Sequence, residues 1–289
     1  MGYECFDVRI EGKVAHVVLC RPEKRNSMIP AFWDELPEIV RDIDENVRAR
    51  AIVLSSTGPH FSAGLDLKAY APAGGAAQTD PAERRRARRT QGARFYDDVR
   101  RMQGAFSALE SCRIPVLAAI QGGCIGGGVD LVTACDMRYA SEDAYLTIFE
   151  TKIGMTADVG TFPRLVKLIP EGIVRELAYT GRRMSAEEAR SVGLVNRVFP
   201  DADSLLAGVS EIAHEIAGHA PLAVYGCKRM INYARDHSTA DGLDYIGIWN
   251  ASMLQPDEMA EALAANAQKR EGDFVELPPV KRRSDGDIF

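Results

Sequence analysis

The sequence lacks several features that would assign it to a well-defined class. It has no apolar run approaching the ~18 residues of a membrane-spanning helix. Its six cysteines form no Cys-x-x-Cys pair and no zinc-ligand spacing, so neither a disulfide scaffold nor a zinc site is indicated. Basic residues are not in excess, because 35 Lys and Arg stand against 41 Asp and Glu, a net charge of −6. This balance argues against non-specific binding to nucleic acids or membrane surfaces.

No targeting segment is recognisable either. The first residues, MGYECFDVRIEGKVAHVVL, contain no secretory apolar region and do not have the Arg- and Ser-rich character of a transit peptide. The last residues, DGDIF, are not a peroxisomal address. Scattered cysteines in a chain of this length are typical of reduced thiols. These observations together predict a cytoplasmic protein.

The sequence does contain short apolar strands that alternate with helical segments. FDVRIEGKVAHVVLC predicts a β-hairpin, and ARAIVLSSTG and IPVLAAI predict buried strands. Ser185 and Glu188 form a capping-box pattern that predicts the start of a helix. After Pro200 the pattern is almost entirely helical to about Gln268. We therefore predict an α/β fold with crossover connections, with a core over residues 1–200 and a helical region over residues 201–289.

The stretch APAGGAAQTDPAERRRARRTQG, residues 71–92, is the least core-like part of the chain. Its composition predicts a mobile loop that runs into a charged helix. The arginine-rich run from Arg84 to Arg89 could bind phosphate, but a solvated helix face is the preferred interpretation.

The most unusual stretch is QGGCIGGGVDLVTACD, residues 121–136, which directly follows IPVLAAI. No register of these glycines gives the GxGxxG dinucleotide fingerprint, and no GK[ST] follows to make a P-loop. The glycines could simply let a helix pack closely on the sheet, as Gly122 and Gly123 can. Three consecutive glycines at a helix start, however, each destabilise the helix by about 1 kcal/mol relative to alanine. Free N–H groups at that point favour an anion, either a permanent phosphate or a transient oxyanion.

A second glycine-containing loop, FSAGLDL, spans residues 61–67 and also follows a buried strand. Two such loops can each donate one N–H to the same oxygen. The order FxAGxDL, then IPxxAAIxGxxxGGGxxL, then a Cys-Asp pair resembles the crotonase, or enoyl-CoA hydratase/isomerase, superfamily over about residues 5–270. The resemblance implies a spiral of ββα units with a C-terminal helical trimerisation region, in a homotrimer or a homohexamer of two stacked trimers.

The resemblance also implies the substrate and the groups that hold it. Family members bind an acyl-CoA thioester and stabilise its enolate through two backbone N–H groups, which match Ala63 and Gly127 here. The family implies no metal and no cofactor, since coenzyme A is part of the substrate. The residues expected to line the thioester end are Ala63, Gly64, Leu65, Asp66, Leu67 and Gly127.

Two of these expectations have plain alternatives. Asp66 in AGLDL is best interpreted as a helix cap. The loop RPEKRNSM offers Arg21, Lys24 and Arg25 where the family places the nucleotide end of coenzyme A, although solvated surface charge would explain them equally well.

Three carboxylates distinguish this chain within the superfamily. Asp130 and Glu150 match the positions of the two glutamates of hydratases. Asp158 stands eight residues after Glu150, where hydratases usually have glycine. The triplet, with GGCIGGGVDLVTACDMRY and TADVGTFPRL, resembles the branch of delta(3,5)-delta(2,4)-dienoyl-CoA isomerases. We therefore expect the three carboxylates to converge on one apolar cavity. Any single one of these carboxylates could instead be a helix cap or lie in a solvated loop.

That branch carries a proton from carbon 2 to carbon 6 of the acyl chain, in the β-oxidation of unsaturated fatty acids. Such a transfer needs two separated acid–base groups, for which Glu150 and Asp158 are suited. By analogy with the hydratase glutamate, Glu150 is assigned to carbon 2 and Asp158 to carbon 6, and the reverse assignment stays open. Asp130 would orient or polarise, and could hold a water molecule.

Three other functions are less consistent with the sequence. A 2-enoyl-CoA hydratase would share Glu150 and the oxyanion hole, but Asp130 and Asp158 argue against it. An RNA-binding member of the superfamily is disfavoured by the net charge of −6 and the complete set of acids. A serine hydrolase is disfavoured because Ser62 is not in a GxSxG elbow and only His60 is near it in the sequence.

Overall fold

A six-stranded sheet lies at the centre of the chain, and a three-stranded sheet lies beside it. The structure is a computed structural model that describes residues 2–70 and 80–280. The strands are β1 (Phe6–Glu11), β2 (Val14–Leu19), β3 (Ala51–Ser56), β4 (Val116–Ile120), β5 (Gly123–Ile125), β6 (Met137–Ser141), β7 (Tyr145–Thr147), β8 (Met184–Ser185) and β9 (Arg197–Phe199). The large sheet has the order β1-β2-β3-β4-β6-β9 and the small one the order β5-β7-β8.

The large sheet is parallel except at its first pair. β1 and β2 form the predicted antiparallel hairpin, whose turn includes Gly12 at φ +59°. All later neighbours in this sheet are parallel. Parallel neighbours need crossover connections, which the helices supply. The predicted α/β class with a largely parallel core is thus confirmed.

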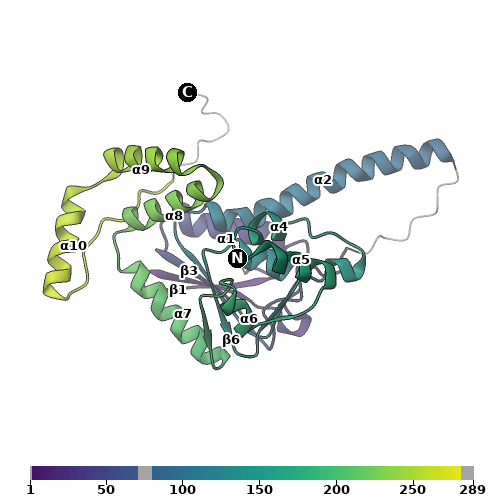
Figure 1. Cartoon of the computed structure of the whole chain (residues 1–289), viewed down its shortest axis with the longest axis horizontal. Coiled ribbons are helices and arrows are strands. Elements are labelled where there is room, and N and C mark those ends of the chain that lie inside the picture. The colour runs from purple at the N-terminus through teal and green to yellow at the C-terminus, as the bar shows by residue number, and fades with distance from the viewer. Residues whose placement is uncertain (1, 71–79, 281–289) are drawn as a thin grey trace.

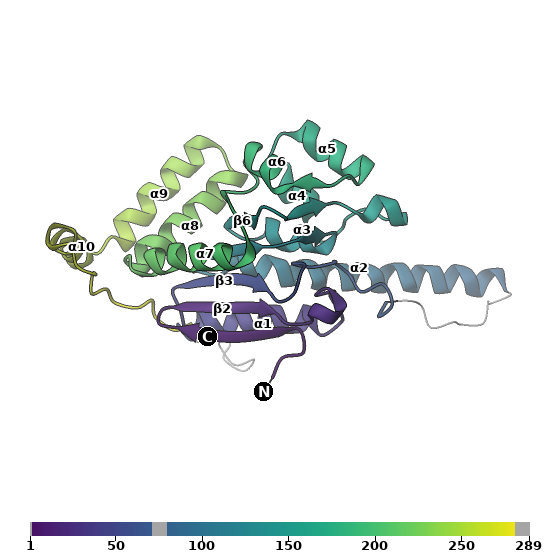
Figure 2. The same cartoon turned by 90° about the horizontal axis from the view of Figure 1, so that it is seen from below.

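Helices cover both faces of the large sheet and continue beyond it (Figures 1 and 2). They are α1 (Phe32–Glu45), α2 (Pro81–Ser111), α3 (Gly127–Thr133), α4 (Thr161–Leu165), α5 (Glu171–Thr180), α6 (Ala186–Ser191), α7 (Ala202–Ala217), α8 (Pro221–Asp236), α9 (Thr239–Met253) and α10 (Pro256–Gln268), with 3-10 turns η1 (Pro22–Lys24) and η2 (Glu150–Ile153). None of the helices in residues 2–70 and 80–280 is both long and apolar enough to cross a membrane.

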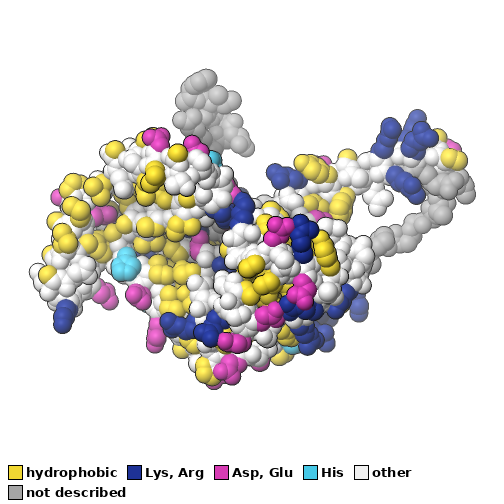
Figure 3. Space-filling view, viewed as in Figure 1, with side chains coloured by type: hydrophobic (Ala, Val, Ile, Leu, Met, Phe, Trp, Pro, Cys, Tyr) yellow, Lys and Arg dark blue, Asp and Glu magenta, His cyan; other side chains and the backbone are white. Residues whose placement is uncertain are grey.

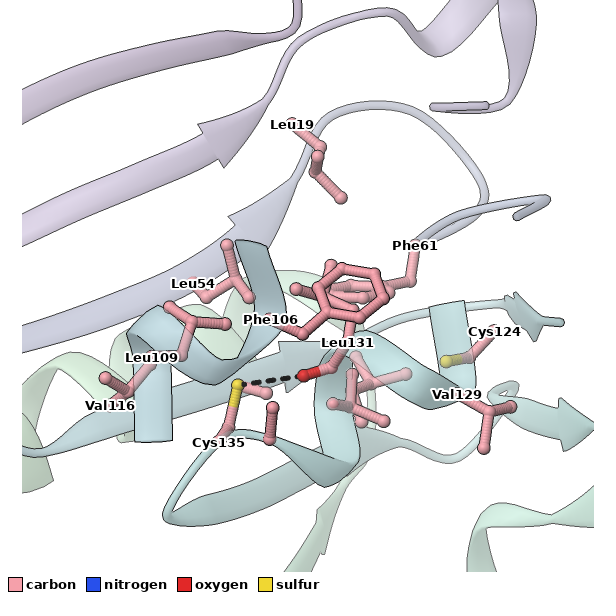
Figure 4. Packing of buried hydrophobic residues seen from close by; sticks show 14 of the residues in the cluster. Leu19, Leu54, Phe61, Phe106, Leu109, Val116, Cys124, Val129, Leu131 and Cys135 are labelled. Carbon is pink, nitrogen blue, oxygen red and sulfur yellow. Dashed lines mark hydrogen bonds between the residues drawn. The ribbon is translucent and has the colours of Figure 1, made fainter. Parts of the chain in front are cut away.

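The alternation of side chains along the central strands creates two hydrophobic layers. Ile52 and Leu54 of β3 face a large cluster with α1, α2 and α3. Val53 of β3 and Leu117 of β4 face the other way and pack against α7. Because successive residues of a strand point to opposite faces, a wholly apolar strand is buried on both sides. Figure 4 shows the first layer, where Leu54 lies near Phe106 of α2.

Helix α2 is a single helix of 31 residues and includes the charged helix that the sequence predicted. Its second half is anchored in the core by Phe106 and Leu109, which are buried. Its first half projects from the body, as Figures 1 and 2 show. The side chains of Arg85, Arg86, Arg88 and Arg89 are exposed there, as expected for a solvated helix face. The mobile loop predicted before this helix falls on residues 71–79, outside the described residues.

The C-terminal helices begin where the sequence predicted and end at Gln268. The boundary proposed at residue 200 falls between β9 and α7, yet α7 itself covers one face of the sheet. Helix α8 is tied to the core by Lys228, which is buried and donates to the carbonyl oxygens of Leu109 and Ile114 at 2.9 Å and to the carboxylate of Asp136 at 2.8 Å.

Several elements were not predicted from the sequence, among them helix α5 and strands β5 and β8. Strand β5 consists of the glycine-containing residues Gly123–Ile125. The local sequence favours a strand in β5 only weakly, because the segment has three residues and begins with glycine, a poor strand former. It forms because these residues pair with β7, which is an interaction between distant segments.

Candidate active site

The two glycine-containing loops of the sequence lie against each other at the start of α3. Ser62 pairs with Cys124 in an isolated parallel bridge. The Ser62 N–H donates to the Gly123 carbonyl at 3.1 Å, and the Ile125 N–H donates to the Ser62 carbonyl at 2.9 Å. The main chains approach so closely that a β-carbon on Gly64 would lie 2.6 Å from the Ile125 carbonyl oxygen. Only glycine fits there, also because Gly64 has φ +75°.

The three consecutive glycines at the start of α3 each meet a different neighbour. A β-carbon on Gly126 would lie 3.0 Å from Glu150 Oε1, and φ at Gly126 is +54°. One on Gly127 would lie 3.1 Å from Met28 Sδ, and one on Gly128 would lie 3.3 Å from Ser62. The glycines therefore let a carboxylate and two loops approach the first turn of the helix.

This arrangement leaves two free N–H groups side by side. Gly127 is the first residue of α3, where an N–H has no partner within the helix. No acceptor for the N–H of Gly127 or of Leu65 lies among residues 2–70 and 80–280. A β-carbon on Gly127 would lie 3.7 Å from the Leu65 nitrogen. Two neighbouring N–H groups without acceptors form a site for an oxyanion.

The structure corrects the choice of Ala63 as the first of these donors. The Ala63 N–H already donates to the Arg25 carbonyl at 2.9 Å. The Gly64 N–H donates to Ser62 Oγ at 3.1 Å, and the Asp66 N–H donates to the Met28 carbonyl at 3.0 Å. The loop motif did not distinguish Ala63 from Leu65, because pairing with residues 25–28 decides which N–H stays free.

The predicted nucleotide-end loop lies directly beside the thioester loop. Met28 and Leu65 form a parallel bridge, and Ser27 Oγ donates to Asp66 Oδ2 at 3.1 Å. The side chains of Lys24 and Arg25 are exposed on this loop. They are therefore available to a ligand that extends outward from the paired N–H groups.

Asp66 has the capping role that the sequence predicted, but it caps a turn. Its Oδ1 accepts from the Lys68 N–H at 3.1 Å and from the Ala69 N–H at 3.3 Å. Residues 67–70 form a turn, and the helix that was expected to follow is not found among the described residues. The next residue of the loop, Leu67, is exposed.

Asp130 lies one turn into α3 and is fully buried. Its Oδ1 accepts from the Thr161 N–H at 2.5 Å, whereas its buried Oδ2 has no partner among the described residues. Burial, together with the charges of Glu150 and Asp158 and opposed by the hydrogen bond from Thr161, raises the pKa of Asp130 to about 7. Asp130 is thus partly protonated near neutral pH.

Glu150 and Asp158 belong to the segment between β7 and α4. Glu150 begins η2, and its Oε2 is buried without a partner among the described residues. Burial raises the pKa of Glu150, and the charge of Asp158 raises it further. Asp158 lies between the buried residues Ala157 and Val159, and burial raises its pKa too.

The structure thus brings the three predicted carboxylates together beside the two free N–H groups. The charges of Glu150 and Asp158 raise the pKa of Asp130, and the charge of Asp158 raises that of Glu150. Neighbouring carboxylates in a poorly solvated site disfavour full ionisation, which favours retention of a proton by the group. Such a group can accept a proton at one point and donate one at another.

The serine-hydrolase interpretation has no geometric support. Ser62 Oγ is buried, donates to the Asn26 carbonyl at 2.8 Å and accepts from the Gly64 N–H. His60 Nδ1 accepts from the Gly123 N–H at 3.0 Å. The His60 side chain thus joins the two glycine-containing loops, and the Ser62 side chain joins its own loop to Asn26, so both have structural roles.

Known proteins resemble the chain over nearly all of its length. Residues 9–276 match the family model described as enoyl-CoA hydratase/isomerase. The chain is 43% identical over 278 residues to the mitochondrial delta(3,5)-delta(2,4)-dienoyl-CoA isomerase of Rattus norvegicus, covering 95% of this chain and 83% of that one. It is 40% identical to the peroxisomal enzyme of that name from Arabidopsis thaliana, covering 92% and 94%. An enoyl-CoA hydratase structure from Bacillus anthracis matches with a TM-score of 0.80 and 32% identity, covering 94% and 99%.

These relatives contradict the cytoplasmic location predicted from the sequence. The proteins from rat and human are named mitochondrial, and the one from Arabidopsis is named peroxisomal. The prediction was wrong because it rested on the lack of a recognisable address. Addresses are read by receptors and are independent of the fold that they accompany.

Proposed function

The chain belongs to the enoyl-CoA hydratase/isomerase family, and we propose that it is a delta(3,5)-delta(2,4)-dienoyl-CoA isomerase. The observation that carries this proposal is the third carboxylate, Asp158, beside Asp130 and Glu150. A shift of two conjugated double bonds needs proton transfer at both ends of a dienolate. One carboxylate cannot reach both carbon 2 and carbon 6.

The thioester carbonyl oxygen binds to the N–H groups of Leu65 and Gly127. As a proton leaves carbon 2, negative charge develops on this oxygen, and both N–H groups stabilise the enolate more strongly than the ground state. The donors belong to main chains held together by the Ser62–Cys124 bridge, so they need no reorganisation during the reaction.

Glu150 and Asp158 carry the proton transfers. Ionised Glu150 takes the proton from carbon 2, the electrons of that C–H bond enter the conjugated dienolate, and protonated Asp158 delivers a proton to carbon 6. The turnover ends with Glu150 protonated and Asp158 ionised, so a proton returns between them or through solvent before the next one. Asp130, buried at the start of α3, polarises the site or holds a water molecule.

The exposed cations of the neighbouring loop are assigned to coenzyme A. Lys24 and Arg25 lie on the loop that pairs with Leu65, so a ligand with its thioester at the two N–H groups can reach them with its phosphates. The chemistry proposed here uses no metal and no cofactor apart from the coenzyme A carried by the substrate.

A parallel assay with two substrates tests this function. With a 3,5-dienoyl-CoA we expect the conjugated-diene absorbance of the 2,4-dienoyl product to grow, at a rate that a chelator leaves unchanged. With crotonyl-CoA we expect little loss of the enoyl absorbance. Rapid hydration of crotonyl-CoA without diene formation would instead identify a 2-enoyl-CoA hydratase, which is the second candidate.

We also propose that the chain assembles as a homotrimer or a homohexamer. Apolar side chains gather on the surface of the C-terminal helices (Figure 3), and the exposed ones from α9 to α10, including Leu254 between the two helices, are Leu243, Ile246, Ile248, Met253, Leu254, Met259 and Leu263. A contiguous apolar surface of this kind is typical of an interface. Sedimentation should give a mass three or six times the 31.6 kDa of the chain. A monomer at micromolar concentration would contradict the proposal.

A further inference from the structure

The carboxyl group of Asp158 is positioned by its main chain alone. No side chain among the described residues forms a hydrogen bond with this carboxyl, which is hydrogen-bonded by the Asp158 main chain. Its segment, between η2 and α4, has no regular secondary structure. The location of the Asp158 carboxyl therefore depends on what holds the backbone of this loop.

One side chain holds that backbone directly. Gln103 Nε2, from α2, donates to the Asp158 carbonyl oxygen at 2.7 Å. The other end of the amide is also fixed, because Gln103 Oε1 accepts from Arg100 Nη1 at 3.0 Å. Arg100 thereby orients the amide so that its NH₂ group faces the loop.

The same face of α2 holds the loop at a second point. Arg164 of α4 donates to Ser107 Oγ at 3.0 Å and to Glu110 Oε2 at 3.1 Å. Gln103, Ser107 and Glu110 are spaced four and three residues apart, so they lie in one row along the helix. The guanidinium crosses Gly160, where a β-carbon would lie 1.9 Å from Arg164 Nη1. Asp158 is itself the first of these two attachments, and Arg164 of the next helix is the second.

We propose that Gln103 is a positioning residue for the isomerisation, which sets the place of the Asp158 carboxyl by fixing the Asp158 carbonyl to the rigid helix α2. This inference rests on the proposed function, in which Asp158 exchanges a proton with the acyl chain. Proton transfer requires the donor within hydrogen-bond reach of the reacting carbon, and a shift of about 1 Å can reduce a rate on the order of 100-fold.

The test is the substitution Gln103→Leu, which removes the donor and keeps most of the side-chain volume. In the assay with 3,5-dienoyl-CoA, we expect kcat to fall roughly 10-fold and KM to change little, because the thioester loop is untouched. In an Asp158→Asn background, the same substitution should change the residual kcat less than about 2-fold, since residues that act through one group are not additive.

A matched control is available on the same helix. Asn232 Nδ2 donates to the Glu110 carbonyl at 3.0 Å, so Asn232→Leu also removes a bond from a side-chain amide to a main-chain carbonyl of α2. This bond is to the main-chain carbonyl of Glu110 and leaves the bond between the Glu110 carboxylate and Arg164 in place, so we expect kcat to be nearly unchanged. Arg100→Leu, at an exposed position, should produce a smaller fall than Gln103→Leu and serves if the latter does not fold.

The outcomes separate this inference from the proposed function. Full activity in Gln103→Leu, or an equal loss in both backgrounds, would overturn the positioning role. Full activity in Asp158→Asn itself would overturn the assignment of Asp158 and thus the proposed function. A 10-fold loss that disappears in the Asp158→Asn background supports both.

Discussion

Replacing Asp158 with asparagine is expected to reduce kcat for 3,5-dienoyl-CoA by about 10²- to 10⁴-fold, the usual contribution of a general acid or base. Asparagine has nearly the same shape but can neither take nor release the proton that carbon 6 requires. The affinity for acyl-CoA should stay within a factor of a few, because the thioester binds at Leu65 and Gly127. Glu150→Gln should have an effect of similar size for the same reason at carbon 2.

The pH dependence follows from the raised pKa values. Burial raises the pKa of Asp158, so its protonated form persists to a higher pH than in an exposed aspartate. Activity is therefore expected to fall as pH rises through the apparent pKa of the acid, and to fall as pH drops through that of the base. Because the carboxylates are coupled, these apparent values belong to the group.

The control for the Asp158→Asn substitution is Asp98→Asn, at an exposed position of α2. It removes a carboxylate that is not among the causes of the pKa shifts of Asp130, Glu150 and Asp158, and it should leave both kcat and the pH profile unchanged. Near-normal activity in Asp158→Asn would exclude the dienoyl-CoA isomerase assignment and favour a reaction that needs only Glu150 and Asp130.

The second large effect is expected for Gly64→Ala. The new methyl group would lie 2.6 Å from the Ile125 carbonyl oxygen and 2.9 Å from the Gly127 nitrogen, so the two loops must separate. The N–H groups of Leu65 and Gly127 can then no longer both donate to the thioester oxygen. Removal of one oxyanion donor typically reduces kcat by about 10²- to 10³-fold, and we expect a loss in that range. Steady-state kinetics of the purified variant measure it.

A matched variant separates this effect from backbone strain. Gly193 also has a positive φ, +84°, but a β-carbon there would have no neighbour within 4 Å. Gly193→Ala should therefore lower the melting temperature without reducing kcat. If both variants lose activity equally, strain rather than the separation of the loops is responsible, and the proposed oxyanion site is wrong.

Much of this molecule follows from local sequence. Apolar runs that are buried on both faces, the Gly12 turn and the Ser185 cap are decided by residues close together in the chain. The Ser185 hydroxyl accepts from the Glu188 N–H as the capping pattern predicted. The positions of Asp130, Glu150 and Asp158 also follow from the sequence, because they stand at fixed distances from recognisable motifs.

Only the tertiary structure decided which groups are free to react. The sequence favoured Ala63 as a donor, but pairing with Arg25 engages its N–H and leaves that of Leu65. Likewise, the link from Gln103 to Asp158 joins residues 55 positions apart. A backbone N–H is identical in every residue except proline, so its availability depends on which distant segment packs against it. Local pattern determines the elements and their motifs, whereas long-range pairing determines which of their polar groups are left for the substrate.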